Sequence, residues 1–97
     1  MRQLEVPDEM KIAIDFANGR VPESVKTFQP LLFKDGDAYC CVLGPDPQLG
    51  VFGCGKTPIA ALKDWDKNLN ERKKVTDKDD EVAVYIQRVI NPDEGGL

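Results

Sequence analysis

The stretch GVFGCGKTP, which runs from Gly50 to Pro58, predicts a sharp passage from a strand into a helix. Thr57 suits the N-cap because its side-chain oxygen can accept a hydrogen bond from the first helical turn. Pro58 suits the first helical position, where no backbone N–H is needed. Val51 and Phe52, near the start of the stretch, are typical of a strand. Gly53 and Gly55 permit the chain to turn sharply after them.

Residues 58–72 predict an amphipathic helix. Their apolar side chains recur every three or four residues, and the polar side chains between them fall on the opposite side of a helical wheel. We expect Trp65 to lie in the core and the helix to fray near Arg72. The apolar side consists of Ile59, Ala61, Leu62, Trp65 and Leu69.

Three strand-like runs precede this helix, at residues 27–33 (TFQPLLF), 38–43 (AYCCVL) and 49–55 (LGVFGCG). An Asp-Gly turn within residues 34–37 joins the first two runs, because Asp-Gly accommodates positive φ. A loop rich in Pro and Gly, residues 44–50, joins the second run to the third. Short connections between consecutive strands predict an antiparallel meander.

Residues 8–18 leave two interpretations open. A helix with Asp8 as its N-cap and Asn18-Gly19 as its stop fits the spacing of several apolar residues, and we favour it. The alternative is a strand that ends in an Asn-Gly turn, since apolar residues also alternate there. The alternating residues are Ile12, Ile14 and Phe16.

The C-terminal part predicts a loop, a strand and a tail. Charges nearly cancel in residues 73–81, which is typical of a solvated loop. Residues 82–90 (VAVYIQRVI) are apolar and rich in β-branched side chains, which favours a fourth strand. Residues 91–97 have the composition of a flexible tail.

The predicted fold is a single α+β domain over residues 1–97, with the order α-β-β-β-α-β and the second helix packed on one face of a small antiparallel sheet. Residues 1–25 form its N-terminal helix and connector.

The chain has 97 residues and a net charge of −4. A net negative charge gives no general attraction to nucleic acid or to an anionic membrane. We therefore expect a partner with a basic protein surface. No apolar run approaches the roughly 20 residues that cross a bilayer, and the first residues contain no apolar signal core. We therefore expect a cytoplasmic protein that does not bind membranes.

Three cysteines are present: Cys40, Cys41 and Cys54. An odd number without a signal sequence predicts a reducing compartment and no disulfide framework. Cys40 and Cys41 should point to opposite faces of a strand, which places them poorly for binding one metal. With no His and no C-x-x-C, we expect no metal site, and we interpret the cysteines as small buried hydrophobes.

No catalytic constellation is apparent in the sequence. The absence of His excludes Ser-His-Asp and Cys-His catalysis. Nothing indicates that two carboxylates converge in a cleft, as paired-carboxylate catalysis requires. We therefore expect neither enzyme activity nor a cofactor.

Gly50, Gly55, Lys56 and Thr57 also match the phosphate-binding pattern G-x-x-x-x-G-K-[ST], which makes nucleotide binding a remote alternative. Such a loop should follow a buried parallel strand, whereas here the pattern lies across a strand of a meander. The pattern still gives one candidate contact site. Lys56 and Thr57 lie beside a helix N-terminus and could bind an anion or an acidic side chain of a partner.

The predicted sheet has edges that could pair with another chain. Pro30 suits an edge strand, and residues 82–90 carry no charge before Arg88. Uncovered strands of this kind favour a homodimer or strand addition to a partner. The sequence therefore favours a binding module over an enzyme.

Residues from Leu31 to about Arg72 resemble the N-terminal domain of HicB-type antitoxins. That family has a strand with a Gly-Asp turn, a second strand that runs into a Pro-containing loop, and a Gly-x-Thr-x-x-x-Ala-Leu step into an amphipathic helix. The matching residues are Gly36, Asp37, Pro45, Pro47, Gly55, Thr57, Ala61 and Leu62.

The resemblance implies a three-stranded antiparallel sheet with one helix packed on it, over a core of residues 26–72. It also implies toxin neutralisation or other protein binding, and a prokaryotic or mobile-element origin. HicB antitoxins usually carry a C-terminal DNA-binding domain. After Arg72 the predicted elements are only a connector and one strand, so operator binding is not expected, and residues 1–25 have no counterpart in the family pattern.

The order helix, three strands, helix is also similar to that of double-stranded-RNA-binding domains, which present lysines at the start of the second helix. Lys56 and Lys63 stand at that place here, but Asp64 and Asp66 offset them. The leading hypothesis is a small non-catalytic protein-interaction module, and double-stranded-RNA binding is the alternative.

Overall fold

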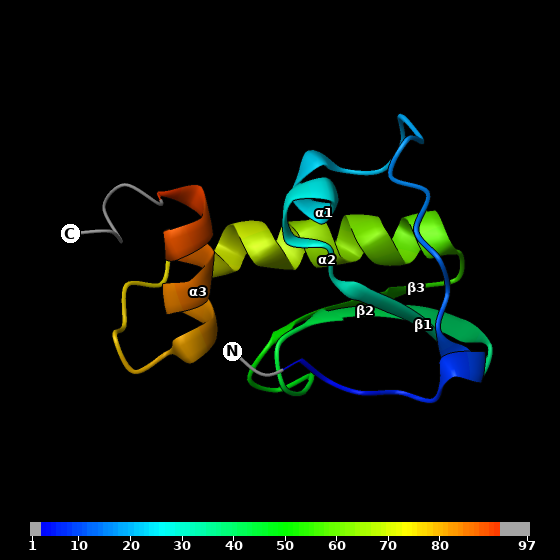
Figure 1. The fold of residues 1–97 in the computed structure, drawn as a ribbon, viewed down its shortest axis with the longest axis horizontal. Helices are drawn as coiled ribbons and strands as arrows, with labels where there is room; N and C mark the ends of the chain where they lie inside the picture. The colour runs from blue at the N-terminus through cyan, green and yellow to red at the C-terminus, as the bar shows by residue number, and fades with distance from the viewer. Residues whose placement is uncertain (1–2, 92–97) are drawn as a thin grey trace.

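The computed structural model describes residues 3–91 as an α+β fold with one three-stranded antiparallel sheet. Two helices lie on one side of the sheet, and a third lies at one end of the molecule (Figure 1). The elements, in chain order, are the 3₁₀ helix η1 (Asp8–Met10), α1 (Glu23–Phe28), β1 (Leu31–Asp35), β2 (Ala38–Leu43), β3 (Val51–Gly55), α2 (Pro58–Arg72) and α3 (Glu81–Ile90).

The predicted meander is confirmed. The strands follow one another in the order β1-β2-β3, and both pairings are antiparallel. Asp35 pairs with Ala38, so only two residues make the first turn, and Gly36 adopts a φ of 62° there. Glycine accepts this left-handed conformation without a clash at Cβ, which fixes the register of the first hairpin.

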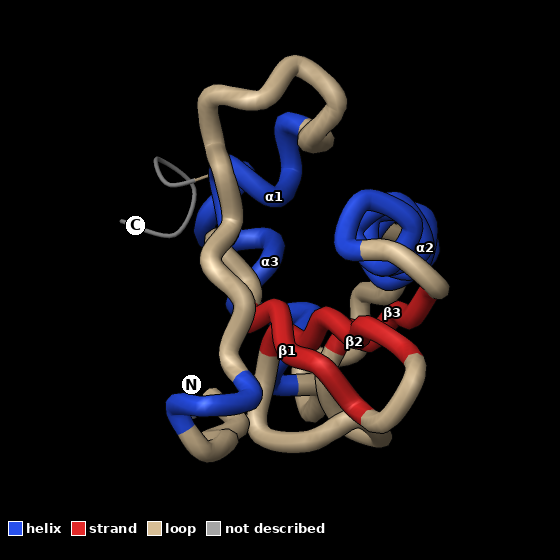
Figure 2. Tube along the Cα trace, turned by 90° about the vertical axis from the view of Figure 1, so that its right-hand side faces the viewer, coloured by secondary structure: helices blue, strands red, loops and turns tan. Residues whose placement is uncertain are grey.

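The predicted helix over residues 58–72 is also confirmed, with its start at Thr57. The Thr57 hydroxyl accepts a hydrogen bond from the Ala60 N–H at 3.1 Å, and Pro58 is the first helical residue. In the backbone trace α2 runs over the sheet (Figure 2). Its buried apolar residues pack in one cluster with residues of the sheet and α1. Trp65 is fully buried and meets Phe28 edge to face, with ring centroids 6.5 Å apart.

The backbones of β3 and α2 approach each other closely at Gly53. A Cβ atom at this position would lie 2.3 Å from the Trp65 backbone nitrogen, a distance that no packed side chain tolerates. Two residues along the strand, a Cβ at Gly55 would lie 2.6 Å from the Ala60 Cβ. The two glycines therefore let the backbone of α2 lie directly on β3.

The face of the sheet that points away from α2, here called the outer face, is covered by the N-terminal segment. Phe33, Cys40 and Val42 are buried on this face beneath side chains of residues 4–10. The Gln3 side chain fixes the segment, since it donates to the Val42 carbonyl at 2.9 Å and accepts from the Gly44 N–H at 2.8 Å. Side chains from both faces of the sheet are thus withdrawn from water.

The prediction of a helix over residues 8–18 is wrong. Only η1 is helical there, and the chain then runs extended beside β1, with a bridge between Lys11 and Phe33 and a hydrogen bond from the Ile12 N–H to the Leu32 carbonyl at 2.9 Å. Burial alternates along the segment, and Ile12 and Ile14 pack on the core. The two-residue periodicity therefore decided the conformation, although it yields one bridge and not a full strand.

The first full helix, α1, lies where the sequence predicted a connector and the start of a strand. It follows Pro22, and its residues Val25 and Phe28 are buried. The first strand-like run is accordingly shorter than predicted, because β1 begins only at Leu31. Gln29, in the left-handed conformation with a φ of 50°, ends the helix and turns the chain into the sheet.

The predicted fourth strand at residues 82–90 is wrong as well, because this segment forms the helix α3. Asp80 caps it by accepting a hydrogen bond from the Ala83 N–H at 3.0 Å. Val82 and Ile86, four residues apart, are buried on one side. The β-branched composition suggested a strand, but the cap and the four-residue spacing prevail. The predicted tail at 91–97 lies almost wholly outside the described residues.

Arg72 joins α3 to the rest of the molecule. Its guanidinium forms an ion pair with Asp80, with Nε and Oδ2 at 2.9 Å, and also donates to the carbonyls of Leu49 and Gly50. The side chains of Arg72 and Asp80 are only 20% and 22% exposed. Residues 73–81 are thus not simply a solvated loop, because Asp80 ties α2, α3 and the β2–β3 loop together.

Replacing Gly53 with Ala should destabilise the protein by about 3 kcal/mol, at the upper end of overpacking effects, because the new methyl group would meet the α2 backbone. Urea unfolding followed by circular dichroism measures this. The control is Gly19→Ala, where a Cβ would meet nothing within 4 Å and the change in stability should stay below about 0.5 kcal/mol. Equal effects of the two substitutions would contradict the close contact.

Replacing Asp80 with Asn should cost about 1–2 kcal/mol at neutral pH, since Asn keeps an oxygen that can cap α3 but removes the charged partner of Arg72. The hydrogen bond from Arg72 lowers the pKa of Asp80 below its ordinary value of 3.8. A lowered carboxyl pKa contributes stability above the ordinary value, and this contribution disappears as the pH falls through the pKa of the folded state.

The stability difference between wild type and Asp80→Asn should therefore be constant above about pH 5 and shrink below about pH 4, as measured by urea unfolding at a series of pH values. Asp79→Asn is the matched control, because Asp79 is exposed and the substitution removes the same charge one residue away. A difference that persists unchanged at about pH 2 would contradict the ion pair.

Candidate functional site

Lys56 and Thr57, the predicted contact residues, lie between β3 and the first turn of α2. Both are exposed. The Thr57 hydroxyl is engaged in capping, as described above. Lys56 therefore remains the part of this pair that can meet a charged group.

The phosphate-loop pattern does not form a loop. Val51–Gly55, which occupies the middle of the pattern, is the strand β3 itself. Its glycines are required by the backbone of α2, which lies against them. The pattern thus arises from the strand-to-helix packing, and the described sheet contains no parallel pair.

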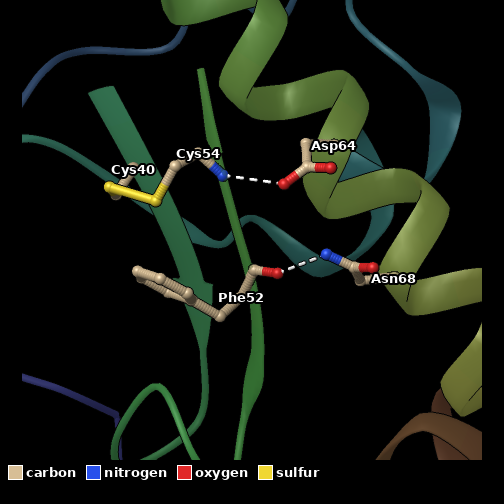
Figure 3. The surroundings of a disulfide bond; sticks show 5 residues. All are labelled: Cys40, Phe52, Cys54, Asp64 and Asn68. Atoms are coloured by element: carbon tan, nitrogen blue, oxygen red, sulfur yellow. Dashed lines mark hydrogen bonds between the residues drawn. A yellow bond between two sulfur atoms is a disulfide. The ribbon is translucent and has the colours of Figure 1, made fainter. Parts of the chain in front are cut away.

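The free edge of β3 is closed by side chains from α2. The Asp64 carboxylate accepts a hydrogen bond from the Cys54 N–H at 2.9 Å, and the Asn68 side chain donates to the Phe52 carbonyl at 2.6 Å (Figure 3). Each bond satisfies a backbone group that points away from β2. Two of the groups that another strand would need are therefore already engaged.

The other edge of the sheet, along β1, is partly covered as well. Lys11 forms a bridge with Phe33 on this edge, and the neighbouring Ile12 N–H occupies the Leu32 carbonyl. Both edges of the sheet thus have partners within the chain, which leaves little room for strand addition.

Cys40 and Cys54 form a disulfide bond between β2 and β3, which corrects the sequence-based expectation of free cysteines. The two residues lie directly opposite each other in the register of the strands, and the bond lies on the outer face of the sheet beside Phe52 (Figure 3). Local sequence does not reveal this pair, because a seven-residue loop separates the two strands and leaves their register open.

Cys41 points to the opposite face, as predicted for a neighbour of Cys40. It is fully buried against α2 and remains a free thiol. Burial raises the pKa of the Cys41 thiol, so the reactive thiolate is disfavoured. Of the three cysteines, Cys41 alone fits the interpretation of a small buried hydrophobe.

Four exposed lysines lie on α2 or next to its ends. Lys56, Lys63, Lys67 and Lys74 are separated by seven, four and seven residues. Lys63 and Lys67 lie about one turn apart and share one side of the helix, whereas Lys56 precedes the N-cap Thr57 and Lys74 follows the C-cap residue. The side with Lys63 and Lys67 lies opposite the buried residues Ala61, Leu62, Trp65 and Leu69.

The aspartates that offset these lysines in the sequence are held beside Lys63 and Lys67. Asp64 accepts from the Cys54 N–H at the edge of β3, and Asp66 accepts from the Ser24 hydroxyl of α1. Both carboxylates are half-buried. Their contacts lie on the two flanks of α2, so two negative charges stand beside the lysines.

A second surface feature is a groove of about 230 Å³ between α3 and the connector that precedes it. Its lining is largely apolar and includes Val75, Ala83 and Val84. At one end the Gln87 side chain donates to the Lys73 carbonyl at 2.8 Å, which holds α3 against the end of α2. The groove is called the α3 groove below.

No family model, curated protein or solved structure matches this chain. Within residues 3–91, no cluster of three or more His, Cys, Asp or Glu side chains could hold a metal ion. In the same part of the chain, no helix has the length and apolar character needed to cross a membrane.

Reduction of the disulfide should lower the stability by about 3 kcal/mol, because the bond closes a loop of roughly 15 residues in the unfolded chain. Urea unfolding with and without a dithiol reductant measures the difference. The Cys40→Ser, Cys54→Ser double variant is the control, since reductant should leave its stability unchanged.

Alkylation in denaturant, followed by mass spectrometry, tests the same pairing directly. Without reductant only the Cys41 thiol should be modified, and after reduction all three cysteines should be. Three modified cysteines before reduction would contradict the disulfide.

Proposed function

We propose that this chain is a non-catalytic protein-interaction module similar to HicB antitoxins, and that it binds its partner through the α3 groove. The groove itself is the observation that carries the proposal. Its floor is apolar, and charged residues such as Asp77, Lys78 and Arg88 surround it. Specific protein interfaces combine an apolar centre with a polar rim in this manner.

Two apolar side chains of α3 remain accessible to a partner. Val84, which lines the groove, is partly exposed, and Ile90, in the last turn of α3, is 43% exposed. The groove has room for apolar side chains of a partner segment. Because Arg72 and Gln87 fix α3 on one side, the groove is formed before the partner arrives, which reduces the entropic cost of binding.

A groove-bound partner replaces the edge-strand contact that the sequence suggested. The segment 82–90, which was expected to present an open edge, is a helix. The β3 edge is closed by Asp64 and Asn68, and the β1 edge is bridged by Lys11. We therefore place the partner on helical surface and not beside a strand.

The HicB-like resemblance supplies the class of partner. The order β1-β2-β3-α2 agrees with the fold that the resemblance implies for residues 26–72. The corresponding proposal is that the partner is a toxin-like protein which this chain neutralises.

The test is a comparison of captured proteins. Val84→Glu should abolish retention of the partner by the tagged protein, because a carboxylate would then stand in the apolar groove. Ala17→Glu is the matched control, since Ala17 is exposed on a loop outside the groove. Both variants should keep the wild-type melting temperature.

A protein that wild type and Ala17→Glu retain and that Val84→Glu loses, identified by mass spectrometry, supports the proposal. Recovery of no protein by wild type, or equal retention by Val84→Glu, overturns it.

A further inference from the structure

Asn18 and Gly19 lie in the loop that joins the N-terminal segment to α1. Residues 15–20 of this loop are all exposed. The sequence suggested the pair as the stop of a helix, but no helix ends there. The pair also lies outside the α3 groove. Its chemistry therefore depends on the contacts that the two residues make within the loop.

The loop turns around Asn18. The Val21 N–H donates to the Asn18 backbone carbonyl at 3.0 Å, and the Arg20 N–H donates to the Asn18 side-chain oxygen Oδ1 at 2.9 Å. The second bond directs the side-chain amide along the following backbone, as in an Asx turn. It also polarises the side-chain carbonyl, so that negative charge developing on Oδ1 would meet a donor already in place.

The backbone nitrogen of Gly19 is a nucleophile next to this carbonyl, because its attack on the Asn18 side-chain carbon Cγ closes a five-membered ring. The Gly19 N–H donates to no acceptor within residues 3–91, so no hydrogen bond has to break before the attack. A Cβ at Gly19 would meet nothing within 4 Å, so the surrounding space is open. A glycine backbone can then rotate toward a near-attack geometry, with the reacting atoms about 3–3.5 Å apart.

The other asparagines lack this combination. Asn68 and Asn70 lie inside α2, where the N–H of each following residue is bonded to the preceding turn. Asn68 also donates its side-chain nitrogen to the Phe52 carbonyl at 2.6 Å. Asn91 is followed by a proline, which has no N–H. Among the asparagines of residues 3–91, Asn18 alone joins a polarised side-chain carbonyl to an unbonded neighbouring N–H.

We propose that Asn18 is a self-modification site, which loses its side-chain amide through a cyclic imide formed with Gly19. The Gly19 N–H gives its proton to solvent base, and its nitrogen bonds to Cγ of Asn18. The bond from Cγ to Nδ2 then breaks, and Nδ2 leaves as ammonia with protons from solvent. The ring holds two carbonyl groups, one from the side chain and one from the backbone of Asn18.

Water is the co-reactant that opens this ring, and no oxidant or reductant is needed. Addition of water at Cγ gives aspartate with the original backbone. Addition at the backbone carbonyl gives isoaspartate, in which the main chain runs through Cγ and is longer by one methylene group. Both products therefore carry one oxygen atom from water and one new carboxylate.

The modification changes the loop in charge and in shape. A carboxylate at position 18 makes the net charge more negative than −4 and stands in the same loop as Asp15. The longer backbone of isoaspartate also displaces the carbonyl that the Val21 N–H now uses. Val21 is buried, so the altered turn adjoins the core beside α1.

This inference is separate from the proposed protein partner, because neither Asn18 nor Gly19 lines the α3 groove. Val84→Glu should deamidate at the wild-type rate. The two proposals can therefore fail independently.

The experiment incubates the full chain in water enriched in heavy oxygen, at neutral and at mildly alkaline pH. Digestion in ordinary water and peptide mass spectrometry follow, so the label marks only the reaction in the intact protein. Asn18 should exchange its NH₂ group for a labelled hydroxyl group, faster at the higher pH, with both aspartate and isoaspartate as products. Release of ammonia should keep pace.

Gly19→Ala should slow the reaction by about tenfold or more, because a Cβ hinders the attack and restricts the backbone. The open space around Gly19 means that this variant keeps the fold. Arg20→Ala is the matched control. It changes the neighbouring side chain but retains the backbone N–H that donates to Oδ1, so the rate should stay that of wild type.

Labelled aspartate and isoaspartate at Asn18, with the slow reaction of Gly19→Ala and the unchanged rate of Arg20→Ala, support the inference. Equal rates in wild type and Gly19→Ala overturn it, as does a product that contains aspartate but no isoaspartate. A rate in the folded protein about tenfold or more below that of the same chain in urea also overturns it, since the fold would then protect the site. Circular dichroism establishes that each variant is folded.

Discussion

The packing of the α2 backbone directly on β3 is the constraint on which the rest of the structure depends. No side chain separates the two elements at Gly53, so the helix lies low across the edge of the sheet. From there Asp64 and Asn68 reach the outward-pointing backbone groups of β3, and Trp65 is pressed into the core beside Phe28. The same orientation turns the lysines outward. The closed edge, the core and the charged surface thus have one geometric origin.

Residues 36–72 could be predicted well because their signals are local. The Asp-Gly turn, the Thr57 cap and Pro58 each act within a few residues, and each appears in the structure as expected. The N-terminal segment could not be predicted in this way, because residues 12–14 extend where they pair with β1, a partner distant in the sequence. The signals for α3 were local: Asp80 caps the helix, and Val82 and Ile86 are four residues apart. The prediction failed there because it gave more weight to the β-branched composition.

The candidate surfaces could also be predicted only where the signals lie close together in the sequence. Lys56 and Thr57 could be located from the helix start alone. The helical wheel also places Lys63 and Lys67 on the polar side of the predicted helix, but it does not show what Asp64 and Asp66 contact. Only the orientation of α2 separates these groups, with the lysines facing water and the aspartates bonded to Cys54 and Ser24. The disulfide also required a register that the long β2–β3 loop leaves open.

Because the N-terminal segment is attached to the end of β2, it can reach its folded position only after β2 has been synthesised. Gln3 and Leu4 form their hydrogen bonds with Val42 and Gly44, residues about forty positions later in the chain. Residues 3–12 therefore leave the ribosome with apolar side chains that have nothing to cover until β1 and β2 have emerged and paired. Until synthesis has passed Gly44, the apolar side chains of residues 4–10 lack the surface that covers them in the folded protein.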